Sequence, residues 1–372
     1  MKITHIHIER FRGFQNEDFE VGSLLTAIAG QNGTQKSTLL GIITQTFTLK
    51  TEDSMRVEKP LCGGSYISAF KDKFRLSPTF DKPKGHEWTI SFDAGMDDFT
   101  VESIKRTGDP NVRFWKKGAR QEGDGYISFP TIFLSLKRLV PVAEEAKIIT
   151  DDTLLTQEEL NEFKQLHNKI LIAQTPISSA TTITSKNKQS IGVSTELYDW
   201  NQNSMGQDNL GKIILALFSF KRLHDKYPRQ YKGGILAIDE MDATMYPASQ
   251  VELLKVLRKY ASKLNLQILF TTHSMSLLKA MDDLVQEVTK KEETANQAKI
   301  LYLKKVDDKI AIKQGVNFKG IQLDLNVVAE GNNRKKNRIT AYTEDKENIL
   351  FVKAILKSKA FVLDFVDVTL PC

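Results

Sequence analysis

One stretch of the sequence decides the fold, and it reads Gly30-Gln31-Asn32-Gly33-Thr34-Gln35-Lys36-Ser37-Thr38. An apolar run, residues 24–29, precedes it, and a second apolar run, residues 39–43, follows it. This order predicts a strand, a glycine-containing loop and a helix, which is the setting of a phosphate-binding loop (P-loop). In such a loop, backbone N–H groups and the positive end of the helix face the phosphates. Lys36 is expected to reach the β- and γ-phosphates of ATP, and the Ser37 hydroxyl is expected to hold Mg²⁺.

The loop departs from the usual pattern at one position. The pattern G-x-x-x-x-G-K-[ST] has a glycine before the lysine, where this chain has Gln35. Glycine suits a position where the backbone passes close to a ligand, so Gln35 is expected to weaken or reshape nucleotide binding. The alternative is an ordinary turn followed by a basic residue, which the strand–loop–helix order disfavours. The expected nucleotide contacts within the loop are Gly30, Asn32, Gly33, Gln35, Lys36, Ser37 and Thr38.

Composition narrows the class of protein. The 372 residues are 41% hydrophobic, which is enough for a packed core and argues against global disorder. The formal net charge of +6 permits contact with nucleic acid without establishing it. Cys62 and Cys372 lie far apart in the sequence, which argues against a disulfide framework and favours a cytoplasmic protein. The charged first ten residues argue against a signal peptide. No uncharged apolar run approaches ~18 residues, so no contact with a membrane is expected.

Hydrophobic periodicity predicts an α/β fold with several buried core strands. The predicted segments are an N-terminal half with an antiparallel β lobe (1–142), a short helical insertion (143–198), a C-terminal half (199–315), and a linker with an incomplete lobe (316–372). Within the insertion, residues 181–190 are rich in Ser, Thr, Lys and Asn and are expected to form a mobile loop.

Acidic residues and a histidine follow two later apolar runs. Asp239 and Glu240 end the run at 235–238, and His273 ends the run at 266–272. Ligands of open α/β sheets bind where parallel strands end, so these residues are expected beside the phosphate loop. Asp239 would then orient the Mg²⁺ shell together with Ser37, and Glu240 would polarise the attacking water. His273 would hydrogen-bond the γ-phosphate; the alternative is an ordinary loop histidine.

A further motif precedes an apolar helix. Ser204 and Gly206 lie just before the apolar residues that begin at Leu210. One interpretation is a simple helix cap made by Ser204. The other is a second phosphate site at the start of the helix, used in trans by a partner molecule.

The four motifs GQNGTQKST, NSMGQD, ILAIDE and TTHS, in this order, resemble those of an ABC-type ATPase of the SMC/RecF/OLD branch. Residues 11–14, Phe-Arg-Gly-Phe, match the aromatic-basic motif near the N-terminus of that branch. The resemblance covers roughly residues 1–50 and 125–315, and it implies an α/β fold with an ABC-type head built on a mixed sheet, with an antiparallel β lobe and a short helical insertion.

The resemblance also implies roles for individual residues. In that branch two heads sandwich two ATP molecules, so Ser204 and Gly206 would contact the γ-phosphate held by a second copy of the chain. Glu240 would be the catalytic base and His273 the switch histidine. Asp242 would lie at the dimer seam. Arg12 would lie near the phosphates.

The insertion is short and lacks sustained heptads, so the chain looks more like compact ATPases of anti-phage systems (OLD, Gabija, Septu-like and retron-associated proteins) than like an SMC protein. The partners implied are a homodimer or higher homo-oligomer, DNA, and an effector nuclease or a retron reverse transcriptase with its RNA–DNA product. Two alternatives stay open. The first is an OLD-type DNA endonuclease, and the second is a DNA-binding clamp or scaffold with little ATP turnover.

The C-terminal segment resembles the opening of a Toprim domain, in which a glutamate, here Glu344, ends the first strand and a helix follows. A Toprim nuclease also needs a D-x-D pair. Asp364 and Asp367 are three residues apart, so on a strand their side chains face opposite sides. Nuclease activity is therefore not assigned to these residues.

Two basic stretches allow two interpretations each. Residues 105–120 place basic side chains around Phe114 and Trp115, and residues 332–338 are basic and polar. Both could contact nucleic acid, the first by phosphate pairing and base stacking. The plainer interpretation, a solvated hairpin and a solvated linker, is favoured.

Overall fold

The computed structural model describes residues 1–66, 73–77, 79–93, 95–105, 112–119, 125–140, 148–151, 154–185, 189–331, 339–357, 360 and 363–367. The chain divides into two compact units, Met1–Phe318 and Lys319–Cys372. Among the described residues, none of the helices combines the length and apolar character needed to cross a membrane.

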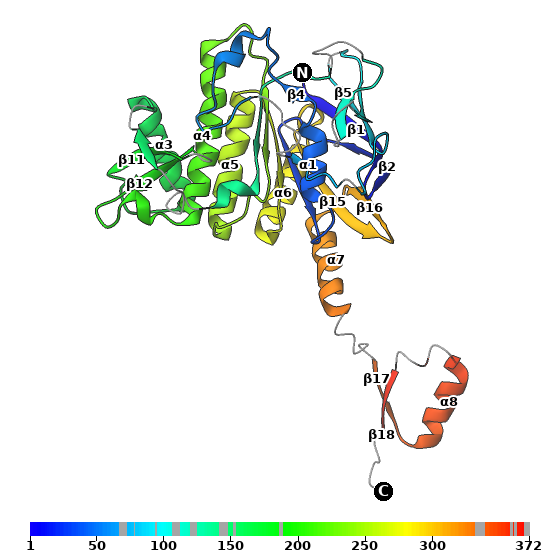
Figure 1. Cartoon of the computed structure of the whole chain (residues 1–372). Helices are drawn as coiled ribbons and strands as arrows, with labels where there is room; N and C mark the ends of the chain where they lie inside the picture. Colours follow the sequence, from blue (N-terminus) through cyan, green and yellow to red (C-terminus); the bar gives the residue numbers. More distant parts are fainter. Residues whose placement is uncertain are drawn as a thin grey trace. The chain divides into compact units, whose positions relative to one another are not determined.

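A six-stranded mixed sheet forms the centre of the first unit (Figure 1). Its order is β16 (Lys309–Gln314), β15 (Ala298–Val306), β3 (Leu25–Gly30), β14 (Leu266–Thr271), β13 (Gly234–Ile238) and β9 (Thr131–Leu134). Neighbouring strands from β15 to β9 pair in parallel, and β16 pairs with β15 antiparallel. Every residue of β3, β13 and β14 is buried, as expected for strands covered on both faces.

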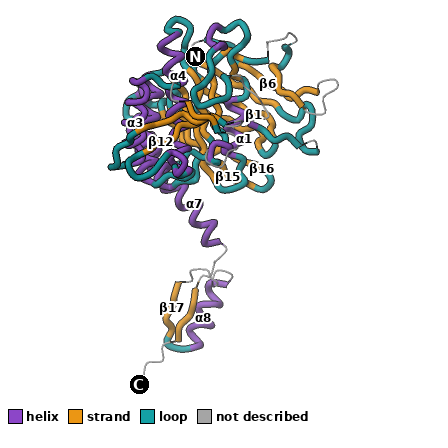
Figure 2. The backbone as a smooth tube through the Cα atoms, turned by 60° about the vertical axis from the view of Figure 1, so that its left-hand side comes forward, coloured by secondary structure: helices purple, strands orange, loops and turns teal. Residues whose placement is uncertain are grey.

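Helices α1 (Lys36–Thr44), α5 (Pro247–Lys263) and α6 (Met275–Val288) pack against strands of this sheet, and α4 is Met205–Lys226. Pro247 occupies the first turn of α5, where its missing N–H breaks no helical bond. Figure 2 shows α3 and α4 on one side of the strands, and β1 and β6 on the other.

The predicted antiparallel lobe is present as a five-stranded sheet. Its order is β2 (Phe14–Glu20), β1 (Ile3–Phe11), β5 (Glu87–Phe92), β6 (Phe99–Lys105) and β7 (Val112–Lys116). Alternate residues of β5 and β6 are buried, because one face of the sheet covers the core. The side chain of Gln267 joins this sheet to the central one: its Oε1 accepts from Ile3 N at 2.7 Å, and its Nε2 donates to Ile3 O at 2.8 Å. A short parallel pair joins β4 (Phe47–Thr48) to β8 (Ile127–Ser128), which lies far from it in the sequence.

The insertion contains the predicted helix, α3 (Gln157–Leu171), which a Thr156–Glu159 capping box begins. It also contains a three-stranded sheet of β10 (Ile149–Asp151), β11 (Ser179–Thr184) and β12 (Gln189–Ser194). The prediction of a mobile loop at 181–190 was therefore wrong for the described residues. The polar Ser and Thr residues indicated a loop, but Thr is β-branched and suits strands. In the structure these residues belong to strands that pair antiparallel.

In the second unit, β17 (Ile339–Thr343), α8 (Lys346–Leu356) and β18 (Leu363–Asp367) form a parallel β-α-β element. Helix α7 is Phe318–Gly331. The side chains of Asp364 and Asp367 and the basic stretch 332–338 lie outside what the structure describes. The predicted fold class, α/β with a mixed sheet, an antiparallel lobe and a short insertion, is confirmed.

Candidate active site

The carboxyl ends of β3, β9, β13 and β14 lie at one edge of the central sheet. The parallel register sets this: Ile238, near the end of β13, lies between Leu134 and Phe270, and Thr271 pairs with Ile28. The phosphate loop, Asp239–Glu240 and His273 each follow one of these strands, so the fold gathers them.

The phosphate loop is glycine-dependent at two points. Gly30 has φ 150° and Gly33 has φ 80°, a region that favours glycine. A Cβ at Gly30 would lie 2.4 Å from Leu303 O, which leaves no room for a side chain. The Lys36 ammonium donates to Gly30 O at 3.0 Å and Gln31 O at 2.9 Å, so it is held inside the loop. Burial lowers the pKa of Lys36, and nearby carboxylates, Glu240 first, oppose that shift.

Gln35 adopts the left-handed conformation, with φ 61° and ψ 33°, at the N-cap of α1. This is the conformation that glycine adopts without strain, which explains why the usual pattern has glycine there. The side chain of Gln35 lies against Gly13, where an added Cβ would be 2.9 Å from Gln35 Nε2. Its Oε1 is buried and makes no hydrogen bond to any residue that the structure describes.

A chain of hydrogen bonds links the loop to the acidic pair. Ser37 Oγ donates to Asp239 Oδ1 at 2.9 Å, and Thr271 Oγ1 donates to the same oxygen at 2.7 Å. The Thr271 hydroxyl in turn accepts from Glu240 N at 2.6 Å. Ser37 and Asp239 therefore present adjacent hard oxygen atoms, the donors that Mg²⁺ prefers, and their chemistry would fit a magnesium ion.

Arg138 is a residue of this site that the sequence analysis missed. It is 2% exposed, and its Nη2 donates to Glu240 O at 2.8 Å. Its Nε donates to Asn209 Oδ1 at 2.7 Å, and Asn209 Nδ2 donates to Ala243 O at 2.9 Å. Burial lowers the pKa of Arg138 to about 10, and Asp239 and the other carboxylates oppose this. Arg138 thus fixes the strained Glu240 backbone, whose φ is 49°.

His273 is exposed just beyond β14. Its backbone N–H donates to Asp242 Oδ1 at 3.3 Å, so the segment after β14 lies close to the segment after β13. Partial desolvation of the imidazole lowers the pKa of His273, as does the charge of Lys36, while Asp242 opposes the shift. The imidazole is therefore held neutral to a lower pH than usual and can accept or donate a hydrogen bond.

Ser204 caps α4, as the plainer interpretation of its motif predicts. Its hydroxyl accepts from Gln207 N, and the Gln207 side chain completes a capping box. Gly206 is buried against the loop after β13, where a Cβ would lie 2.5 Å from Thr244 O. These contacts place the start of α4 beside the segment that carries Glu240. The close approach of Thr244 O explains why position 206 is glycine, with no need for a bound ligand.

Arg12, at the turn between β1 and β2, lies beside the first turn of α1. Its Nη1 donates to Thr38 Oγ1 at 3.4 Å. Asp81 holds the guanidinium with both carboxylate oxygens, at 3.0 and 2.9 Å. Burial raises the pKa of Asp81, but hydrogen bonds from Arg12, Ser77 N and His86 outweigh it and lower the pKa to about 2. Asp81 was also missed, because its partner lies 69 residues away.

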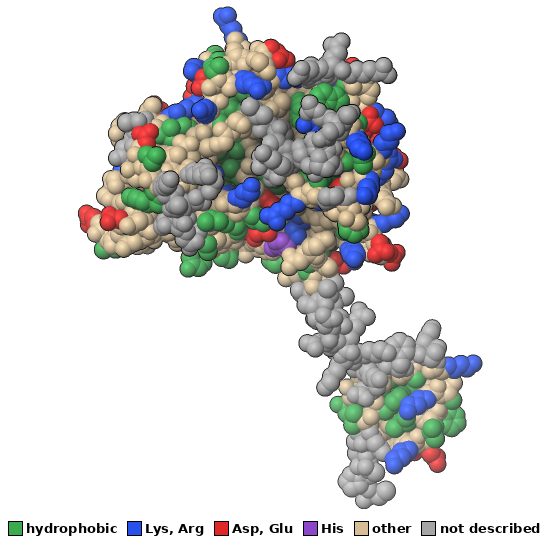
Figure 3. Space-filling view, in the orientation of Figure 1, with side chains coloured by type: hydrophobic (Ala, Val, Ile, Leu, Met, Phe, Trp, Pro, Cys, Tyr) green, Lys and Arg blue, Asp and Glu red, His purple; other side chains and the backbone are tan. Residues whose placement is uncertain are grey.

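The basic segment 105–120 does not offer both of its aromatic rings for base stacking. Phe114 is 3% exposed and packs against Trp88 and Phe11 in the core, so the less favoured alternative, base stacking by this ring, is contradicted. Lys117 donates to Glu87 at 2.6 Å. Residues 106–111 and 120 lie outside the described residues. In Figure 3, Lys and Arg side chains gather at the right-hand edge of the larger unit.

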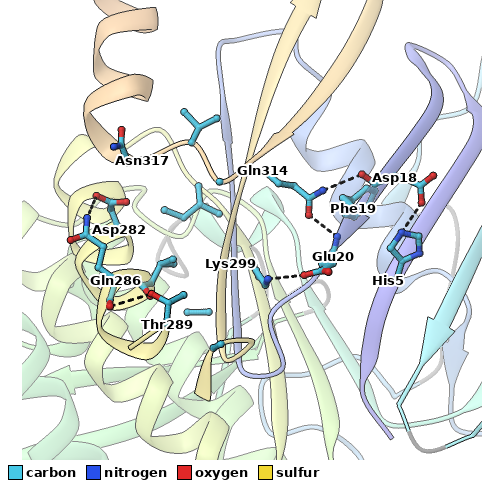
Figure 4. Close-up of a pocket in the computed structure, with 16 residues that line it drawn as sticks. His5, Asp18, Phe19, Glu20, Asp282, Gln286, Thr289, Lys299, Gln314 and Asn317 are labelled. Carbon is cyan, nitrogen blue, oxygen red and sulfur yellow. Dashed lines mark hydrogen bonds and ion pairs between the residues drawn. The ribbon is translucent and has the colours of Figure 1, made fainter. Parts of the chain in front are cut away.

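A separate cavity of about 700 Å³ lies between the edge of the antiparallel sheet, β15 and α6 (Figure 4). Its polar side chains pair with one another: Lys299 Nζ donates to Glu20 Oε2 at 2.7 Å, and His5 lies 2.6 Å from Asp18. The cavity shares no lining residue with the phosphate loop.

Comparison with known proteins gives a partial match. Residues 136–278 match the family model of an AAA ATPase domain. This range contains Ser204, Gly206, Asp239, Glu240 and His273 but not the phosphate loop. A comparison with curated proteins gave no match.

Solved structures of SMC heads align with most of the chain. The SMC head domain of Thermotoga maritima has 14% identity and a TM-score of 0.46, and covers 85% of this chain and 100% of its own. An SMC head bound to the C-terminal winged-helix domain of ScpA has 14% identity and a TM-score of 0.48 (87% and 100%). One with an extended coiled coil, bound to the C-terminal domain of ScpA derived from Pyrococcus furiosus, has 13% identity and a TM-score of 0.47 (88% and 99%). Of these comparisons, the family match is the one that bears on function. It indicates that residues 136–278, which include Asp239 and Glu240, are similar to an ATPase domain.

Proposed function

We propose that this chain binds ATP with Mg²⁺ at residues 30–38 and hydrolyses it. The observation that carries the proposal is the 2.9 Å hydrogen bond from Ser37 Oγ to Asp239 Oδ1. It joins the phosphate loop to the end of β13, 202 residues later in the chain. The match of residues 136–278 to an AAA ATPase domain supports the same conclusion.

The residues divide the chemistry among them. Lys36 leaves the loop carbonyls and binds the β- and γ-phosphates, and Ser37 and Asp239 hold Mg²⁺. Mg²⁺, when bound, neutralises negative charge that develops on the phosphates. Glu240 orients and polarises the attacking water. His273 hydrogen-bonds the γ-phosphate, and Arg12 contributes positive charge beside α1.

Steady-state phosphate release tests this assignment. Glu240→Gln is expected to slow ATP turnover by roughly 10²- to 10⁴-fold while ATP still binds, because a general base typically contributes that factor. Lys36→Ala is expected to weaken ATP binding itself. Glu293→Gln, which changes an exposed glutamate far along the sequence, is the matched control. Wild-type turnover by Glu240→Gln would show that another group acts as the base.

We further propose that two copies of the chain sandwich two ATP molecules, with Ser204 and Gly206 of one copy completing the site of the other. Asp242 would lie at the seam. Two exposed apolar side chains support an interface here: Met205, at the start of α4, is 47% exposed, and Tyr246, at the start of α5, is 84% exposed.

ATP-driven dimerisation would control an effector, either a nuclease or a reverse transcriptase with its RNA–DNA product, in anti-phage defence. The motif resemblance and the compact insertion, whose helix α3 has 15 residues, support this role. The test is purification of the full-length protein from its native host. Co-purification of a nuclease or of a nucleic-acid-bearing polymerase is expected, and recovery of the ATPase alone would contradict the proposal.

Two other functions have a specific feature in their favour. The β17-α8-β18 element, with Glu344 after β17, favours an OLD-type endonuclease. Metal-dependent DNA cleavage that is lost in Glu344→Ala would establish it. The strained Gln35 favours a DNA clamp that holds ATP with little turnover. A large rise in turnover in Gln35→Gly would support the clamp.

A further inference from the structure

A groove of about 250 Å³ runs between α3 and α5, away from the phosphate loop. Each helix lines it with one face, since the lining positions recur every three or four residues. From α3 the lining residues are Glu162, Gln165, Leu166 and Lys169. From α5 they are Lys255, Val256, Lys259, Tyr260 and Lys263.

The groove is strongly basic. Its four lysines are all exposed. Its one carboxylate, Glu162, accepts from Lys221 Nζ at 2.6 Å and from the Tyr260 hydroxyl. Lys221 thus neutralises Glu162 within the wall of the groove. Lys255 also forms an ion pair with Glu252 at 2.6 Å. Surface ion pairs of this kind contribute little to stability.

The lysines of α5 form a row. Lys255, Lys259 and Lys263 are four residues apart, so they follow one another at about 6 Å along the helix and span about 12 Å. Like charges at this spacing repel each other and destabilise the helix slightly. A bound polyanion that follows the groove would relieve this repulsion, and Lys169 would meet it from the opposite wall.

We propose that the groove between α3 and α5 binds the phosphate backbone of a nucleic acid without reading its sequence. Charge complementarity favours a polyanion with regularly spaced charges, because the lysine row on α5 runs along the groove and the one lining carboxylate, Glu162, is already paired. Each cation lining the groove is lysine, a mobile point charge that contacts a phosphate without fixing a base. Tyr260, the one aromatic lining residue, is 5% exposed, so no ring is offered for base stacking.

The proposal does not depend on the ATPase assignment, because the groove shares no residue with the phosphate loop. Its test is binding of a labelled 30-nucleotide single strand and of the matching duplex to the full-length chain, followed by fluorescence anisotropy between 50 and 200 mM KCl. Wild type is compared with Lys259→Ala/Lys263→Ala. A second pair, Lys290→Ala/Lys291→Ala, makes the same change of net charge at exposed lysines outside the groove.

Four phosphate contacts give a slope of log K against log salt of about −2.8 for a single strand or −3.6 for a duplex. The groove pair is expected to make that slope shallower by about 1.4 or 1.8, respectively, and the control pair is expected to leave it unchanged. Thermal melting checks that both variants fold, as expected for exposed positions.

Three results would overturn the proposal. The groove pair could bind as wild type does, or both pairs could weaken binding equally, which would reduce the effect to overall charge. The third is loss of poly-glutamate binding by the groove pair with nucleic-acid binding intact. That result would assign the groove to an acidic protein segment.

Discussion

Replacing Gln35 tests how the phosphate loop tolerates a residue other than glycine. Gln35 has φ 61° at the N-cap of α1, and its buried Oε1 lacks a hydrogen-bond partner among the described residues. Two separate costs follow. The left-handed conformation costs a residue with a Cβ roughly 1–2 kcal/mol. An unpaired buried carbonyl costs about 1–3 kcal/mol.

Two variants separate these costs. Gln35→Ala removes the unpaired carbonyl but keeps the strained backbone, so it should gain about 1 kcal/mol or more in free energy of unfolding. Gln35→Gly removes both costs, although the more flexible unfolded chain takes back roughly 0.5–1 kcal/mol. The glycine variant should therefore exceed the alanine variant by about 0.5–1 kcal/mol.

Urea unfolding without nucleotide, followed by tryptophan fluorescence, measures these differences. Trp88, Trp115 and Trp200 all lie in the first unit, so the signal reports the unit that holds the loop. The expected order of stability is glycine, then alanine, then wild type. A glycine variant less stable than the alanine variant would refute the strain argument. An alanine variant no more stable than wild type would refute the argument from the unpaired carbonyl.

Four other changes have defined outcomes. The folded protein holds the pKa of Asp81 at about 2, against an ordinary 3.8. Asp81 therefore contributes roughly 2 kcal/mol to the free energy of unfolding above pH 4, and this contribution is lost as the pH falls towards 2. Acid unfolding of Asp81→Asn, followed by circular dichroism, should lack that part of the pH dependence. Arg138→Lys should lower the free energy of unfolding by about 2–4 kcal/mol in urea, because buried hydrogen bonds break. Gly206→Ala should lower the melting temperature, since its Cβ would lie 2.5 Å from Thr244 O and overpacking costs about 1–3 kcal/mol. Tyr246→Glu should leave the melting temperature unchanged but weaken any ATP-dependent dimer in sedimentation velocity, because the side chain is 84% exposed.

The features predicted from sequence are those that local pattern determines. Apolar runs followed by glycine, Asp239 or His273 predict parallel strands whose ends meet, and the register of the central sheet agrees. The cap at Ser204 follows from its spacing to Gln207, and the structure contains that capping box.

The features that were missed depend on contacts between distant segments. Arg138 donates to the carbonyl of Glu240, 102 residues away, and a backbone carbonyl leaves no signature in the sequence. Asp81 lies outside every motif, and its importance follows from folding beside Arg12. Residues 181–190 looked like a loop because polar residues dominate them, and the described part of this stretch belongs to β11 and β12, which only their pairing makes a sheet.

Sedimentation velocity of Glu240→Gln with Mg²⁺ and ATP tests most directly the proposed ATP sandwich between two copies of this chain. The slowed variant should form a dimer that disappears without nucleotide and does not form when Lys36→Ala is added. A variant that binds ATP yet stays monomeric at high protein concentration would contradict the sandwich. Ser204 and Gly206 would then serve only to begin α4 against the loop at Thr244.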